Sequence, residues 1–251
     1  MHFLTKNGNN DVFERKVKEM STRRLAIITA RGGSKRIPKK NIREFCGKPI
    51  IGYSIQAAKD AGVFDKVMVS TDSEEIAEIA KAEGAEVPFL RSEATSGDFA
   101  TTSDVIMEVL LEYEKSGVFF DEVCCIYPTA PFITGEKLKD AVALLEEKQY
   151  DSVMPVTPFS FPPLRGMVLD GDKISYKWEK YEDYRSQDLE TIYHDCGQFY
   201  VLDVEIFKKT SKLVTKNTGA IEISELEMQD IDNEIDWKLA ELKYRLLREE
   251  K

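Results

Sequence analysis

A basic loop that contains two adjacent glycines is the strongest chemical signal in this sequence. Residues 30–41, ARGGSKRIPKKN, directly follow the apolar run LAIIT. Gly32 and Gly33 allow backbone amides to approach a polyphosphate without interference from a Cβ atom. The loop also carries five cationic side chains in a chain whose net charge is −10: Arg31, Lys35, Arg36, Lys39 and Lys40. These features predict a phosphate-binding loop.

The spacing within this loop excludes two common nucleotide-binding motifs. It matches neither G-x-x-x-x-G-K-[ST] nor G-x-G-x-x-G, which disfavours a P-loop ATPase and a dinucleotide-dependent dehydrogenase. The alternative is a surface loop with solvated charges. Its place after an apolar strand favours ligand binding, because ligands of open α/β sheets lie at the carboxyl ends of strands.

Acidic residues near the end of the chain form a second candidate site. Asp230 and Asp232 are separated by one residue, so in an extended segment both carboxylates point to the same side. Such a pair suits a divalent cation, which prefers oxygen ligands. From the residues alone, a helix cap or a partner of the helix dipole is the stronger alternative, and we expect only that role for Glu234 and Asp236.

Asp72 presents the same ambiguity between a functional residue and a cap. It follows the apolar run VMVST, but the tetrapeptide DSEE has the form of a capping box before IAEIAKAEG. We therefore predict that Asp72 belongs to a helix cap.

Short apolar runs alternate with helical patterns from Leu25 onward, which is typical of an α/β protein. LAIIT and EVCCIY are apolar at successive positions, as expected for strands that are covered on both faces of a parallel sheet. We predict a doubly wound, Rossmann-like three-layer sandwich with a mostly parallel sheet.

The chain divides into a polar N-terminal extension, residues 1–22, and one domain, residues 23–251. The alternation of strand and helix patterns is interrupted at about residues 159–194. This stretch is rich in proline, glycine and aromatic residues, and we interpret it as an insertion. The final stretch NEIDWKLAELKYRLLREE has apolar residues at helical spacing and predicts a closing amphipathic helix.

Composition excludes several classes of function. With 42% hydrophobic and 32% charged residues, the chain is ordinary for a globular protein, and its net charge of −10 disfavours nucleic acid and anionic membranes as partners. No run approaches the roughly 20 apolar residues of a membrane helix, and the N-terminus lacks the apolar stretch that is typical of a secretory signal, so we expect none. The four cysteines lack C-x-x-C spacing, and Cys124 and Cys125 should face opposite sides of a strand. We expect reduced thiols and a cytoplasmic protein.

Several motifs together resemble the acylneuraminate cytidylyltransferase family, the CMP-sialic acid synthetases. The resemblance extends from about residue 25 to 247 through ARGGSKRIPKKN, FCGKPIIGYSIQAA, VMVSTDSEEIAEIA, VPFLRSEATSGDFATTSDV, CIYPTAPF, FSFPPLR, RSQDLE, YHDCGQFY and QDIDNEIDWKLAE. It implies a nucleotide-diphospho-sugar transferase-like fold and transfer of CMP from CTP to a nonulosonic acid, with release of pyrophosphate, for surface glycans or flagellin. It also implies magnesium (Mg²⁺) as cofactor and a homodimer formed by the insertion.

The resemblance assigns roles to individual residues. The nucleotide side comprises Ala30, Arg31, Gly32, Gly33, Ser34, Lys40, Asn41, Arg91, Ser96 and Thr101. The sugar side comprises Tyr127, Thr129, Arg165, Tyr193 and Gln198, and the magnesium ligands are Asp230 and Asp232. Catalysis would fall to Arg31, Lys40 and the two aspartates. Helix capping is an equal alternative for Thr101, and a polar core position is one for Gln198.

Two departures from the neuraminate enzymes indicate the sugar. This chain has Cys196-Gly197 where those enzymes typically have an asparagine-glycine pair, and Tyr127 where they have glutamine. We therefore expect pseudaminic acid as the substrate, with N-acetylneuraminate and legionaminate as alternatives. A nucleotide-binding module without turnover is the alternative from another class, and a lid over its own subunit is the alternative role of the insertion.

Overall fold

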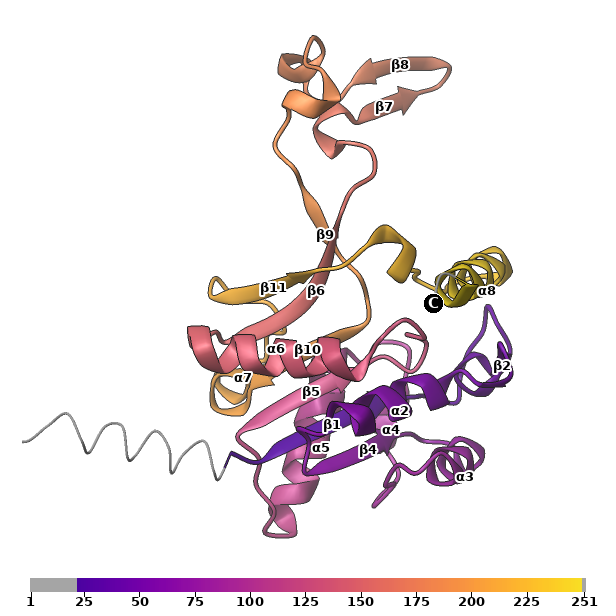
Figure 1. Ribbon diagram of the computed structural model, residues 1–251, viewed down its shortest axis with the longest axis vertical. Coiled ribbons are helices and arrows are strands. Elements are labelled where there is room, and N and C mark those ends of the chain that lie inside the picture. The colour runs from indigo at the N-terminus through magenta and orange to yellow at the C-terminus, as the bar shows by residue number, and fades with distance from the viewer. Residues whose placement is uncertain (1–21, 250–251) are drawn as a thin grey trace, which may run out of the picture.

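A seven-stranded sheet forms the centre of the computed structural model, which describes residues 22–249 (Figure 1). Its strands follow the order β11-β6-β10-β5-β1-β4, and β9 pairs with β6 outside that path. They span Arg24–Thr29 (β1), Lys66–Ser70 (β4), Glu122–Ile126 (β5), Ser152–Pro158 (β6), Tyr193–Asp195 (β9), Phe199–Asp203 (β10) and Thr218–Glu222 (β11). β1 is parallel to β4 and β5, and β11 is parallel to β6, whereas β10 runs antiparallel to both neighbours. The mostly parallel sheet is thereby confirmed.

Helices cover both faces of this sheet. One face packs against α2 (Ile51–Ala61), α3 (Glu74–Ala82) and α6 (Gly135–Lys148), and the other against α5 (Thr102–Lys115) and α7 (Val204–Thr210). Consecutive residues of β1 alternate between the two cores: Ala26 and Ile28 belong to the first, and Leu25 and Ile27 to the second. This alternation explains why the strands are continuously apolar, and it confirms the three-layer architecture.

The adjacent cysteines follow the same alternation. Cys124 lies in the first core and Cys125 in the second, as the sequence predicts. Both are buried, and burial raises the pKa of the Cys125 thiol to about 12. All four cysteines are free thiols in this structure.

The closing helix α8 (Glu234–Glu249) packs beside the sheet rather than on it. Its Trp237 and Ala240 join a third core with Phe45, which belongs to the small hairpin of β2 (Glu44–Phe45) and β3 (Lys48–Pro49). The Phe45 ring meets the rings of Trp237 and Tyr244 edge to face, with centroids 5.6 and 5.5 Å apart. These contacts fix the start of α8, and hence the acidic tract before it, beside the basic loop.

An arm leaves the sheet between β6 and β9 and projects away from it (Figure 1). It contains the hairpin β7 (Met167–Asp170) and β8 (Lys173–Tyr176) and the short 3-10 helices η2 (Pro163–Arg165), η3 (Glu179–Tyr181) and η4 (Ser186–Asp188). Leu169 and Ile174 are exposed on this hairpin. The arm therefore presents an apolar surface outside the sheet, on a two-stranded hairpin of a kind that is marginally stable when isolated in water.

The remaining short elements are η1 (Lys40–Ile42), α4 (Glu93–Ser96) and η5 (Glu225–Glu227). The predicted N-terminal extension lies outside the described residues, except for Thr22. Within residues 22–249, no helix combines the length and the apolar character that crossing a membrane requires.

Candidate active site

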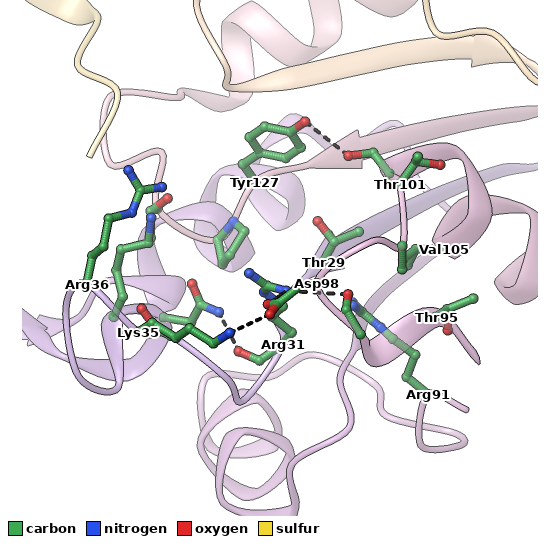
Figure 2. Close-up of a pocket in the computed structure, with 18 of the residues that line it drawn as sticks. Thr29, Arg31, Lys35, Arg36, Arg91, Thr95, Asp98, Thr101, Val105 and Tyr127 are labelled. Atoms are coloured by element: carbon green, nitrogen blue, oxygen red, sulfur yellow. Dashed lines mark hydrogen bonds and ion pairs between the residues drawn. The ribbon is translucent and has the colours of Figure 1, made fainter. Parts of the chain in front are cut away.

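A cavity of about 600 Å³ opens at the carboxyl ends of β1 and β5. Figure 2 shows the cationic side chains of Arg31, Lys35 and Arg36 on one side of it, with Tyr127 and Thr101 lining another part. The lining comprises Thr29, Arg31, Ser34, Lys35, Arg36, Ile37, Lys40, Asn41, Arg91, Thr95, Gly97, Asp98, Ala100, Thr101, Thr102, Val105, Tyr127, Pro128, Thr129 and Asp232. Segments remote in sequence therefore meet at the edge of the sheet that the motif placement predicts.

The basic loop is held in place through its backbone. The Gly32 amide donates a hydrogen bond of 2.7 Å to Asp72 Oδ1, and the Asn41 amide group donates one of 2.8 Å to the Arg31 carbonyl. A Cβ atom on Gly32 would lie 3.1 Å from Ser73 Cβ, which is too close for an ordinary contact. Glycine at this position thus permits the loop to approach the segment after β4 closely.

The predicted role of Asp72 as a helix cap was wrong. Ser73 is the N-cap of α3, and its side chain accepts a hydrogen bond from the Ile76 amide. Asp72 precedes the cap, and its carboxylate instead holds Gly32 of the basic loop. The sequence signal was ambiguous because two consecutive polar residues preceded the helix.

Carboxylates surround the cations of the loop. Asp98 pairs with Arg31 at 2.9 Å and with Lys35 at 2.5 Å. Asp232 pairs with Arg36 at 2.9 Å and lies 3.8 Å from Lys40 Nζ, which also donates a 2.6 Å hydrogen bond to the Ile231 carbonyl. Burial lowers the pKa of Lys40, while the neighbouring Asp232 and Asp230 act in the opposite direction. A polyphosphate entering the cavity would compete with these carboxylates for the same cations.

The segment between α3 and α5 contributes Arg91 and Thr101. Arg91 is buried, and its guanidinium donates to Ser70 Oγ at 3.0 Å and to the Ser70 carbonyl at 2.7 Å. Thr101 forms a reciprocal capping box with Asp104 at the start of α5. The capping alternative is therefore confirmed for Thr101, although this residue also lines the cavity.

The structure brings only part of the predicted set to the cavity. The predicted residues that do not line it are Ala30, Gly32, Gly33, Ser96, Arg165, Tyr193, Gln198 and Asp230. Ala30 is buried in the core, and Ser96 donates a hydrogen bond to the Ser92 carbonyl. Arg165 belongs to the arm and donates to the Tyr176 hydroxyl, and Tyr193 donates to Glu222.

Gln198 lies in the core immediately before β10. It is 2% exposed, and its amide nitrogen donates a 2.7 Å hydrogen bond to the Glu227 carbonyl. Its side-chain oxygen has no hydrogen-bond partner among the described residues. In this structure Gln198 therefore occupies a polar core position and retains one unused acceptor.

The residues of the acidic tract, 230–236, have different positions: some lie at the cavity and others at the start of α8. Asp232 lines the cavity and Asp230 does not, and the pKa of Asp230 is raised by burial and by the charge of Asp232. Asp236 accepts hydrogen bonds from the Asp232 and Asn233 amides, so its predicted role at the helix start is confirmed. Glu234, in the first turn, pairs with Arg43 at 2.6 Å.

A metal ion at this tract would need further ligands. Within residues 22–249, no three His, Cys, Asp or Glu side chains are grouped to hold a metal. Two adjacent carboxylates, one of which has a raised pKa, nonetheless fit a hard cation that completes its shell with ligand and water oxygens.

Sequence reasoning did not foresee the contacts that two residues make in the site. Asp98 forms ion pairs with Arg31 and Lys35, and the Thr102 and Tyr127 hydroxyls are hydrogen-bonded at 3.1 Å. Both lie within the loop SGDFATT, which the sequence analysis connected with the nucleotide. Their partners are far along the chain, so no local pattern reveals them.

Comparisons with known proteins agree with this geometry. A family model described as "Cytidylyltransferase" matches residues 25–233. Pseudaminic acid cytidylyltransferase of Campylobacter jejuni (serotype O:2) is 36% identical over 226 residues, which cover 90% of this chain and 97% of that protein. CMP-N,N'-diacetyllegionaminic acid synthase of Legionella pneumophila is also 36% identical, with 86% and 94% covered.

A solved structure of CMP:2-keto-3-deoxy-manno-octonic acid synthetase complexed with CTP superposes with a TM-score of 0.66. It is 16% identical to this chain, and the match covers 91% of this chain and all of the other. At this identity the likeness shows the fold alone, and it supports the nucleotide-diphospho-sugar transferase-like architecture.

The neighbours Asp72 and Ser73 provide a matched test of the site. Asp72→Ala removes the acceptor of the Gly32 amide, and we expect affinity for a nucleoside triphosphate to fall about tenfold, as when one charge-assisted hydrogen bond is lost. Ser73→Ala removes only the cap of α3 and should cost about 1 kcal/mol of stability without changing the affinity. Calorimetric titration and thermal unfolding measure the two effects. Equal affinities for both variants would contradict the assigned role of Asp72.

Proposed function

Since this chain belongs to the cytidylyltransferase family, we propose that it transfers CMP from CTP to the anomeric hydroxyl of a nonulosonic acid and releases pyrophosphate. One observation carries the proposal. A loop bearing Arg31, Lys40 and Asn41 faces the same cavity as Tyr127 and Asp232, so a triphosphate and an acceptor sugar can meet there. The proposed nucleotide contacts are those residues of the basic loop together with Arg91 and Thr101.

Positioning and charge neutralisation account for the chemistry. In this reaction the sugar oxygen bonds to the α-phosphorus of CTP while the bond to pyrophosphate breaks, so negative charge grows on the departing group. Arg31 and Lys40 supply fixed positive charge on the side of the cavity formed by the basic loop. A cation oriented before the reaction stabilises that charge without a reorganisation cost, and no covalent enzyme intermediate is needed.

Pseudaminic acid is the sugar that we propose. Support comes from the C. jejuni relative and from Tyr127, which stands where the neuraminate enzymes have glutamine and which lines the cavity here. The Legionella relative, a legionaminic acid synthase by name, is also 36% identical to this chain, so legionaminic acid is the alternative sugar. Thr129 lies beside Tyr127 in the cavity, whereas Gln198, Tyr193 and Arg165 would reach a sugar only after rearrangement or in an assembly.

Cytidylyltransferases generally need a divalent metal, and we propose magnesium held by Asp230 and Asp232. The two carboxylates offer the hard oxygen donors that Mg²⁺ prefers. When bound, the ion would offset the negative charge of the triphosphate. Arg36 pairs with Asp232, and Lys40 lies near it. These two cations keep the Asp232 carboxylate at the edge of the cavity.

A homodimer is the assembly that we propose, with the arm as its interface. The arm exposes Met167, Leu169, Ile174 and other apolar side chains outside the sheet. An isologous contact would cover two such surfaces at once. Arg165 and Tyr193, which do not line the cavity of their own subunit, would then be available to the partner's sugar.

A substrate panel tests the proposed reaction. Pyrophosphate release is measured with magnesium, each of four nucleoside triphosphates, and pseudaminic, legionaminic and N-acetylneuraminic acids. We expect the highest kcat/KM with CTP and pseudaminic acid. Lys40→Ala should lower turnover by orders of magnitude with an unchanged circular dichroism spectrum, because it removes a fixed cation from the site.

Lys35→Ala serves as the control for Lys40→Ala. Lys35 also lines the cavity, but its side chain is 79% exposed, against 22% for Lys40. Its loss should have a smaller effect, because an exposed charge is screened by solvent. Equal losses in the two variants, or unfolding of Lys40→Ala, would count against the assignment.

Asparagine variants test the proposed metal ligands. Asp230→Asn and Asp232→Asn keep the shape of each side chain but remove the charge that a divalent cation requires, so we expect loss of magnesium-dependent activity. EDTA should have the same effect on the wild type. Asp236→Asn is the control, because Asp236 binds backbone amides at the helix start. Near-normal activity of both test variants would mean that the tract acts only at the helix start.

Light scattering tests the proposed dimer. At micromolar concentration we expect a mass of twice 28.6 kDa. Leu169→Asp, at a position 70% exposed on β7, should shift the protein toward the monomer, because a charge in an apolar contact is costly to bury. A monomeric wild type that keeps full activity on dilution would overturn the shared-site proposal.

A further inference from the structure

The segment between α4 and α5 is anchored at both ends, while its tip, residues 97–100, is held in a different way. At one end, Glu108 of α5 accepts hydrogen bonds from the Ser92 amide at 2.8 Å and from the Thr95 hydroxyl. At the other end, Thr101 forms the capping box of α5. These hydrogen bonds do not involve the tip, so both ends can stay in place when the tip moves.

One side chain ties the tip to the basic loop. The tip has the sequence GDFA, so Asp98 is its only polar side chain. Asp98 pairs with Arg31 at 2.9 Å and with Lys35 at 2.5 Å (Figure 2). Arg31 also donates a 3.4 Å hydrogen bond to the Gly97 carbonyl. Phe99 is 99% exposed, so its ring does not pack the tip against the protein.

Asp98 contacts these two cations as a phosphate group would. Its Oδ1 faces Arg31 and its Oδ2 faces Lys35. Arginine and lysine use the same donors for carboxylate and for phosphate oxygens. All three side chains line the cavity, and the nearby Lys35 and Arg31 lower the pKa of Asp98, so the carboxylate is ionised at neutral pH. An anion of the chain itself thus occupies cations of the loop that is predicted to bind phosphate.

The contact is exposed enough for a ligand to displace it. The side chains of Arg31, Lys35 and Asp98 are 41%, 79% and 48% exposed. Ion pairs at such exposure are screened by solvent and contribute little free energy. A polyphosphate carries several negative charges and more acceptor oxygens than one carboxylate, so it competes effectively for both cations. Once Asp98 is displaced, the tip loses its side-chain tether while its two ends remain anchored.

We propose that Asp98 is an intramolecular competitor of the nucleotide: it occupies Arg31 and Lys35 in the free protein, and a polyphosphate displaces it together with the tip. The inference rests on the proposed function in taking the basic loop as the site of the triphosphate. It adds that the free protein holds this site in a self-inhibited state.

Removal of the competing charge should strengthen polyphosphate binding. Asp98→Asn keeps the shape of the side chain but removes its charge, so Arg31 and Lys35 are left for the ligand. Calorimetric titration with inorganic tripolyphosphate should give a Kd about fivefold lower than that of the wild type, as expected when exposed ion pairs no longer have to be broken. The difference should shrink as salt is added, because salt screens exposed charges. An unchanged or higher Kd would overturn the proposal.

Glu75→Gln is the matched control. Glu75 pairs at 2.6 Å with Lys39, which is another cation of the basic loop, and neither side chain lines the cavity. This variant also removes one negative charge beside the loop, but it frees no cation that faces the cavity. Its Kd for tripolyphosphate should equal that of the wild type. Equal gains in Glu75→Gln and Asp98→Asn would overturn the proposal, because they would show a general effect of net charge.

A fluorescent reporter at the tip tests its movement. Phe99→Trp places an indole at an exposed position, and the unmodified protein with its two tryptophans gives the background. Tripolyphosphate should change the emission of this variant. In the double variant with Asp98→Asn, the altered emission should already be present without ligand and should change little on its addition. An emission that tripolyphosphate leaves unchanged while Asp98 is present would overturn the proposed displacement.

These measurements separate the inference from the proposed function, because tripolyphosphate contains neither cytidine nor sugar and no turnover is needed. Tighter binding by Asp98→Asn would support the inference even if no sugar were activated by CTP. Unchanged binding would overturn it even if CTP were turned over.

Discussion

The parallel alignment of β1 with β4 and β5 is the constraint on which the site depends. Thr29 at the end of β1 pairs with Ser70 of β4, and Ile28 pairs with Ile126 of β5. The three segments that follow these strands therefore start at one edge of the sheet. The hydrogen bond from Gly32 to Asp72 then joins two of them, and Tyr127 follows the third.

Aromatic packing and complementary charge together place the last part of the chain at this edge. The basic loop concentrates positive charge in a protein whose net charge is −10. Asp232 comes to Arg36 and Lys40 from nearly 200 residues away, and the aromatic contacts of Phe45 with α8 hold it there. Exposed ion pairs contribute little stability by themselves. Their value here is that they keep the cations oriented toward the cavity until an anionic ligand competes for them.

The fold and the basic loop could be predicted from the sequence because both have local signatures. Continuous apolar runs indicated buried parallel strands, and glycine and lysine spacing after the first run located the loop. Asp72 was misjudged because its partner, Gly32, is 40 residues away. Arg165 and Tyr193 were assigned by resemblance, and their distance from the cavity depends on the path of the arm, which no local pattern specifies. The antiparallel direction of β10 was likewise invisible to hydrophobic periodicity, since that pattern does not depend on strand direction.

β10 also brings a remote part of the chain to the edge of the sheet at which the cavity opens. Because it runs antiparallel between β5 and β6, it brings Phe199 opposite Ile126 and Tyr200 opposite Cys125, next to the end of β5 where Tyr127 enters the cavity. β9 also runs antiparallel to β6, so the chain keeps its direction from β9 to β10 and only bulges at residues 196–198. Asp195 accepts hydrogen bonds there from the Gly197 amide and from the Tyr200 hydroxyl. A parallel strand at this position would carry its first residues to the opposite edge of the sheet. β9 and β10 both run against the parallel strands, and together they bring Asp195 and Tyr200 near the end of β5, after which Tyr127 lines the cavity.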